Sequence, residues 1–289
     1  MAPHDERGHG APAPAPEPLP VAVVDNHTHL DIRRDDLASP LRSDEGVAAA
    51  LAVAAEVGVD RVVQVGCDLK SARWTVEILD DHPAMLGAVA LHPNEAPRLA
   101  DEGRLAEALA EIETLAAHPR VRAVGETGLD YYRTGEGGVA AQQESFRWHI
   151  DLAKRTGKAL QIHDRDSHED VLRILAEEGA PETTVLHCFS GDLAMARECV
   201  ERGYHLSFAG TVTFKSAAGL REALAHTPLE QVLAETDAPY LTPTPERGRA
   251  NAPYLLPHTV RVMARTLGVD VPTMCAAISE TSERVYGPW

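Results

Sequence analysis

Short apolar runs rich in β-branched residues alternate with longer amphipathic stretches along most of the chain, and this rhythm limits the possible folds more than any other feature. Most of the runs are continuously apolar rather than alternating, which is typical of parallel strands covered on both faces. The predicted strands are Val21–Asp25, Arg61–Gly66, Leu86–Leu91, Val121–Glu126, Ala159–His163, Thr183–His187, Tyr204–Phe208 and Val232–Asp237.

The stretches between these runs have helical patterns and helical ends. Phe146, Ile150 and Ala153 share one face of a helix, and glycines such as Gly157 and Gly203 stand where helices should end. The helices with the clearest patterns are Gly46–Val57, Leu105–Ala117, Val139–Thr156, Tyr254–Leu267 and Pro272–Val285.

Eight strand–helix alternations in one unbroken series predict an α/β protein with a (β/α)8 barrel, whose usual length is about 250 residues. A doubly wound open sheet is the alternative. Ligands of an open sheet gather at one switch point, whereas those of a barrel come from the C-terminal ends of many strands. Here polar residues end at least five of the runs, so the barrel is favoured.

The end of the first strand carries a pair of histidines, His27 and His29. Residues two apart on an extended strand point the same way, so both rings can bind one metal ion. Glu126 ends the fourth predicted strand, where Gly125 and Gly128 replace bulky residues. A carboxylate buried there must be paired or metal-bound, and because it can bridge two cations we expect Glu126 to be a bridging ligand.

Three more polar residues end later strands. His163 and His187 end neighbouring strands, and Asp237 ends the last one, which returns beside the first in a barrel. A single histidine at a strand end is often a structural residue, but two of them next to a carboxylate are more typical of a metal site. Asp237 is expected to bind metal, to orient the attacking water and to accept its proton, and Glu235 is expected to support the site from within the barrel.

These six residues are enough for two divalent ions. The first set is His27, His29, Glu126 and Asp237, and the second is Glu126, His163 and His187. Mixed imidazole and carboxylate ligands favour Zn, Mn, Fe or Ni over Ca, and suit Mg weakly. Two ions about 3.5–4 Å apart can bind the attacking and leaving oxygens of a phosphodiester.

The composition restricts the classes of partner. The formal net charge of −17 at pH 7 argues against a broad basic surface for nucleic acid. Cys67, Cys188, Cys199 and Cys275 are far apart, which disfavours disulfides or a thiolate zinc site and favours the cytoplasm. No run is long enough to span a membrane. Residues 1–20 are rich in Pro and Ala and are expected to form a disordered tail before a barrel domain at 21–289.

Six motifs resemble, in order, those of the TatD-type deoxyribonucleases of the amidohydrolase-like metal-dependent hydrolase superfamily. They run from DNHTHLD through LHP, VGETGLDYY, QIHDRD and LHCFSG to ETDAPYLTP. The resemblance implies a barrel enzyme that trims DNA from the 3′ end with divalent metal. It implies the same six metal ligands. Separately, the net charge of −17 favours single-stranded or frayed ends that reach into a pocket over long duplex.

The resemblance also implies residues that contact the substrate phosphate. His92 of the LHP motif matches such a position, and Arg249 and Asn251 match a basic loop after the last strand. Arg165 follows His163 by two residues, and its guanidinium suits phosphate oxygens, although a surface salt bridge would also explain it.

The substrate stays open between DNA and two alternatives, a small molecule and the ester bond of aminoacyl-tRNA. Many barrels of this superfamily act on small molecules, but these often bridge their metals with a carboxylated Lys where this chain has Glu126. The charge of −17 is compatible with DNA only if the ions, Arg165 and Arg249 supply a local positive field. We expect a monomer, because no interface stripe is evident.

Overall fold

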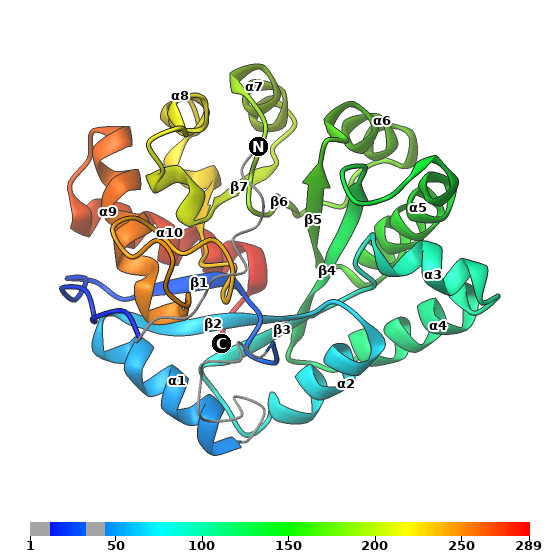
Figure 1. The fold of residues 1–289 in the computed structure, drawn as a ribbon, viewed down its shortest axis with the longest axis horizontal. Coiled ribbons are helices and arrows are strands. Elements are labelled where there is room, and N and C mark those ends of the chain that lie inside the picture. The colour runs from blue at the N-terminus through cyan, green and yellow to red at the C-terminus, as the bar shows by residue number, and fades with distance from the viewer. Residues whose placement is uncertain (1–11, 33–43) are drawn as a thin grey trace.

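The computed structural model describes residues 12–32 and 44–289. Eight parallel strands form one sheet in the order β1 to β8, and helices surround it (Figure 1). The strands are β1 Val23–Thr28, β2 Val59–Gly66, β3 Met85–Val89, β4 Val121–Asp130, β5 Ala159–Arg165, β6 Thr184–Leu186, β7 His205–Phe208 and β8 Val232–Ala234. All eight predicted strands are confirmed, with ends that differ by a few residues.

The sheet closes into a barrel without a regular ladder between β1 and β8. A single bridge joins Thr28 to Ala238, just beyond β8. Around it, the Asp237 amide donates to the His27 carbonyl at 2.9 Å, and the His29 amide donates to the Ala238 carbonyl at 2.8 Å. The seam therefore places the two histidines that end β1, His27 and His29, beside Asp237. The predicted (β/α)8 barrel is confirmed.

The helices cover the outside of the barrel. Those that follow β1 to β4 are α1 Asp44–Glu56, α2 Leu69–Ile78, α3 Glu95–Asp101, α4 Leu105–Ala116 and α5 Val139–Thr156. The helices that follow β5 to β8 are α6 His168–Glu178, α7 Leu193–Glu201, α8 Ala218–Ala225, α9 Leu256–Leu267 and α10 Val271–Tyr286. Short 3-10 turns are η1 Glu136–Gly138, η2 Gly210–Thr213, η3 Leu229–Gln231 and η4 Pro253–Leu255.

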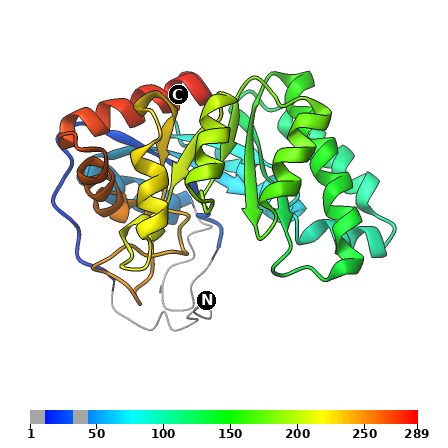
Figure 2. The same ribbon diagram turned by 90° about the horizontal axis from the view of Figure 1, so that it is seen from above.

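The barrel has two apolar cores, one between strands and helices and one inside the ring of strands. The inner core includes Val63, Leu86 and Leu233, and Tyr286 of α10 packs against it. The Tyr286 hydroxyl accepts a hydrogen bond from Gln161 on β5 at 2.7 Å. The end of α10 thus closes the inner core at the opposite end from the polar residues, and Figure 2 shows α10, in red, along that edge of the barrel.

Residues 12–20 pack on the barrel, which differs from the expected disordered tail. Leu19 is buried, and its amide donates to the Val57 carbonyl at 3.0 Å. The Tyr254 hydroxyl donates to the Ala13 carbonyl at 2.8 Å. Although proline removes backbone donors, the carbonyls of this segment still accept hydrogen bonds, and apolar side chains supply contact area. The rest of the predicted tail lies outside the described residues.

No helix within residues 12–32 and 44–289 combines the length and apolarity that crossing a bilayer requires.

Candidate metal centre

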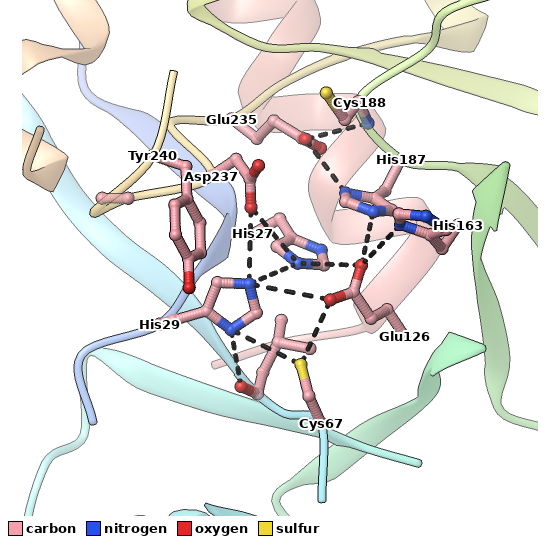
Figure 3. A network of polar contacts seen from close by, with 12 residues as sticks. His27, His29, Cys67, Glu126, His163, His187, Cys188, Glu235, Asp237 and Tyr240 are labelled. Atoms are coloured by element: carbon pink, nitrogen blue, oxygen red, sulfur yellow. Dashed lines mark hydrogen bonds and ion pairs between the residues drawn. The ribbon is translucent and has the colours of Figure 1, made fainter. Parts of the chain in front are cut away.

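Four strand ends and the seam bring the six predicted ligands together at one end of the barrel (Figure 3). His27 lies in β1 and His29 just after it, while Glu126 and His163 lie in β4 and β5. His187 follows β6 directly, and Asp237 lies three residues beyond β8. The strands are parallel, so their C-terminal ends share one rim, and the alternation that fixes the inner core also directs these side chains toward the barrel axis.

The histidine pair and Asp237 form the first cluster. The Nε2 atoms of His27 and His29 are 3.2 Å apart. Asp237 Oδ1 lies 3.9 Å from the first of these nitrogens and 3.4 Å from the second. Three ligand atoms from three residues thus face a common point.

Glu126 joins this cluster to a second one. Its Oε2 lies 2.6 Å from His187 Nε2 and 3.4 Å from His163 Nδ1. Its Oε1 lies 3.8 Å from His29 Nε2. Because the two oxygens of one carboxylate face different histidines, Glu126 is positioned as a bridge between two ions.

A layer of acceptors orients the imidazoles. Buried Glu235 accepts from His187 Nδ1 at 3.2 Å and from the Cys188 amide at 2.8 Å. The Val65 carbonyl lies 3.0 Å from His29 Nδ1, and Asp130 Oδ2 lies 3.3 Å from His163 Nε2. Such partners fix the ring orientation of metal-binding histidines. Glu235 occupies the supporting position that the sequence indicates.

Burial and mutual charge set the protonation of the cluster. Burial alone would raise the pKa of Glu126, but the imidazoles of His187 and His92 hold it well below the usual value. Burial alone would lower the pKa of His29, yet hydrogen bonding to Asp237 and the charge of Glu126 raise it to about 9. Burial and the neighbouring His187 keep the pKa of His27 well below its usual value. Glu126 is therefore ionised and His27 neutral, which are the forms that bind metal, whereas His29 carries a proton that a bound ion would displace.

The donor chemistry fits divalent ions. Among the described residues, four groups offer possible ligand atoms that lie within 4.8 Å of one another. They are His27 with Glu126 and His187, His27 with His29 and Asp237, His29 with Cys67 and Glu126, and His92 with Glu126 and His163. Imidazole nitrogens and carboxylate oxygens gathered in this way are the donor set that Zn²⁺ and similar divalent ions take.

Five of the six ligands, all except the fully buried His27, line a cavity of about 550 Å³. Of the four residues expected to bind phosphate, two line this cavity and two do not. His92 and Arg165 line the cavity. Asn251 does not; it is buried and donates to the carbonyls of Thr236 and Tyr240, so it fixes the loop around Asp237 instead.

Arg249 is also absent from the described wall of the cavity. Its Nε lies 3.0 Å from Glu246 Oε2, and its Nη1 donates to the Pro12 carbonyl at 3.3 Å. The structure therefore does not bring Arg249 and Asn251 to the wall of the cavity that His92 and Arg165 line. Both residues tie the loop after β8 to its surroundings, a role that sequence position alone does not distinguish from substrate contact.

Several cavity residues escaped the sequence reasoning. Cys67, Asp130 and Arg133 all line the cavity, and Asp130 also contacts His163. A signal for Asp130 existed in the Glu-Thr-Gly-Leu-Asp run, since Glu126 and Asp130 are an even number of residues apart along one strand. In the structure, positive φ values also mark this rim: Cys188 has φ 42° and Asp237 has φ 51°, values that non-glycine residues seldom adopt.

A (β/α)8 barrel with this donor set at the C-terminal ends of its strands defines a metal-dependent hydrolase of the amidohydrolase-like class. A model of the family described as TatD related DNase matches residues 24–287. The chain belongs to that family.

Relatives and solved structures agree with this assignment. An uncharacterized metal-dependent hydrolase, TatD, of Mycobacterium tuberculosis is 49% identical over 92% of this chain and 98% of its own length. YabD of Bacillus subtilis, also an uncharacterized metal-dependent hydrolase, is 34% identical over 91% of this chain and 98% of its own. The crystal structure of YjjV, a TatD homologue from Escherichia coli, superposes with a TM-score of 0.81 at 24% identity and covers 91% of this chain and 97% of that one. This structural likeness shows the fold.

Proposed function

We propose that this hydrolase is a deoxyribonuclease that removes nucleotides from the 3′ ends of single-stranded or frayed DNA, using two divalent ions. The observation that carries the proposal is the bridging position of Glu126 between two histidine clusters. When bound, two such ions supply Lewis-acid activation of a phosphodiester and neutralise its developing charge. His27, His29 and Asp237 would hold one ion with Glu126, and His163 and His187 the other.

Asp237 is suited to the proton transfer. Its side chain is 13% exposed and faces the cavity, so it can contact both a ligand histidine and a water molecule. We propose that it orients the attacking water and accepts a proton from it. A general base in this role must lie within hydrogen-bond reach of the water whose proton it accepts.

His92 is suited to hold a phosphate oxygen. Its Nδ1 accepts a hydrogen bond from the Asn94 amide at 3.1 Å, so the neutral ring carries its proton on Nε2. That nitrogen lies 3.9 Å from Glu126 Oε1, beside the proposed ions. Burial lowers the pKa of His92 to about 3, so the ring is a neutral donor at physiological pH. Its Nε2–H can therefore donate to a phosphate oxygen without competing for a proton.

Cations near the centre support a polyanionic substrate despite the net charge of −17. Arg133 and Arg165 line the cavity, and the Arg165 guanidinium stacks 3.9 Å above the half-exposed ring of Tyr132. A guanidinium held against an aromatic face can bind phosphate while the ring edge contacts a base. We propose that the flexible end of a single strand enters this cavity. A rigid duplex would need a broad basic surface on the protein, which the net charge of −17 argues against.

A second candidate is hydrolysis of a small phosphoester or carboxylic ester, or of aminoacyl-tRNA. The cavity volume lies in the range of small-molecule sites, and the carboxylates of Asp68, Glu95 and Asp164 line it too. Those charges would oppose a long polyphosphate chain.

The test is cleavage of 5′-labelled single-stranded DNA by metal-reconstituted protein, with a circular single strand as a substrate that lacks ends. We expect products that shorten stepwise from the 3′ end, an intact circle, and loss of cleavage in Asp237→Asn. Arg249→Gln is the matched control and should cleave normally. A protein that binds two ions but leaves both the linear and the circular DNA uncut would refute the nuclease proposal. Small esters and aminoacyl-tRNA would then be the substrates to test.

Two further proposals accompany this function. We infer a cytoplasmic enzyme, which the four free cysteines support, and a monomer.

A further inference from the structure

A thiol lies beside the bridging carboxylate. Cys67 directly follows β2, and its Sγ lies 3.1 Å from Glu126 Oε1 and 3.7 Å from His29 Nδ1 (Figure 3). Its backbone is fixed on both sides, because its amide donates to Ser71 Oγ at 2.9 Å and its carbonyl accepts from the His92 amide at 2.8 Å. The fold therefore fixes the backbone of Cys67 at a position from which its sulfur contacts Glu126.

We propose that Cys67 is a sulfur ligand to the ion held by His29 and Glu126, and that it biases the centre toward thiophilic cations such as Zn²⁺. The three residues offer ligand atoms that all lie within 4.8 Å of one another. Glu126 presents Oε1 to this side and Oε2 to His187 and His163, so the sulfur would serve one ion of the pair. This inference rests on the metal-binding roles proposed above for His29 and Glu126.

The chemistry of the donor decides the preference. Imidazole and carboxylate ligands alone accept Mn²⁺ and tolerate Mg²⁺, whereas a thiolate selects Zn²⁺ and similar soft or borderline ions. On coordination the Cys67 thiol loses its proton to solvent, and its S–H···O bond to Glu126 is replaced by bonds from both groups to the ion. No oxidant or reductant is needed.

Another thiol of the cavity provides a matched control. Cys188 lines the same cavity but belongs to none of the candidate ligand groups among the described residues. Figure 3 shows its sulfur directed away from Glu126.

The experiment is reconstitution of the metal-free protein with Co²⁺, whose thiolate complexes have a sulfur-to-metal charge-transfer band in the near ultraviolet. We expect this band in the wild type and in Cys188→Ser, and its loss in Cys67→Ser. In competition titrations, the preference of Cys67→Ser for Zn²⁺ over Mn²⁺ should fall about tenfold or more. Serine keeps a donor to Glu126, so a role limited to that hydrogen bond would leave the preference unchanged.

Two failures are distinguishable. If the wild type binds Co²⁺ stoichiometrically without the band, or if Cys67→Ser keeps the Zn²⁺ preference, the sulfur is not a ligand while the proposed metal centre stands. If a folded wild-type protein, judged by its thermal unfolding, binds no ion, both the inference and the proposed centre are overturned.

Discussion

Glu235 offers a sharp test of how the barrel positions its metal ligands. The carboxylate is fully buried, and one oxygen accepts hydrogen bonds from both His187 Nδ1 and the Cys188 amide. Replacing Glu235 by Gln keeps the shape but removes the charge that holds the His187 proton on Nδ1. His187 then spends part of its time with Nε2 protonated or misdirected, and Nε2 is the nitrogen that faces Glu126 at 2.6 Å.

The size of the effect follows from the role. Loss of a partner that orients a metal-binding histidine costs roughly 10- to 100-fold in metal affinity, or about 1.4–2.7 kcal/mol. The loss should fall on the ion that His187 binds and leave the other nearly unchanged. Competition of Glu235→Gln with a chromophoric chelator for Zn²⁺ measures both affinities.

The control is Glu198→Gln on the exposed face of α7, which should bind both ions like the wild type. Thermal unfolding of the metal-free proteins tests whether Glu235→Gln is folded. If a folded Glu235→Gln binds both ions within about twofold of the wild type while His187→Ala loses one, Glu235 does not position His187 and the reasoning is refuted.

Three further predictions concern substrate binding, acid stability and the backbone. Arg165→Gln should raise the KM for single-stranded DNA about tenfold or more, since a hydrogen bond to a charged group contributes roughly 1.5–3 kcal/mol. The control Arg249→Gln should leave the KM unchanged. Equal KM values for the two variants would show that Arg165 does not contact the substrate. Burial lowers the pKa of His149 to about 3, so the unfolded state binds more protons below about pH 6.5. The metal-free wild type should lose on the order of 3 kcal/mol more unfolding free energy than His149→Gln between pH 7 and pH 4 in urea titrations, and parallel curves would contradict this. Gly128 has φ 130°, and a Cβ there would lie 2.1 Å from the His163 carbonyl oxygen, while Gly103 has φ 68° and open space around it. Gly128→Ala should therefore cost about 4 kcal/mol or more and Gly103→Ala only about 1–2 kcal/mol, and similar melting temperatures would show that the contact is relieved.

The sequence was sufficient for the barrel because each parallel strand is buried on both faces and has a continuous apolar signal. The sequence also predicted that His27, Glu126 and His187 lie close together, because the last residues of all parallel strands lie at one rim of the barrel. The same logic could not foresee that β4 extends to Asp130 and adds a carboxylate beside His163.

Loop residues escaped this logic. Asn251 and Arg249 lie beyond the last strand, where position along the chain does not determine which way a side chain points, and both turn toward the protein. The sequence does not connect Cys67 with the site because its neighbours there, His29 and Glu126, are distant along the chain. Leu19 was assigned to a tail because proline-rich composition suggests extension but does not reveal packing against the barrel.

Anomalous diffraction from crystals grown with Zn²⁺ tests the two-metal centre most directly. We predict two anomalous peaks at the C-terminal end of the barrel, one beside His27, His29 and Asp237 and one beside His163 and His187, with a Glu126 oxygen at each. A single peak, or two peaks not bridged by Glu126, would contradict the proposed centre.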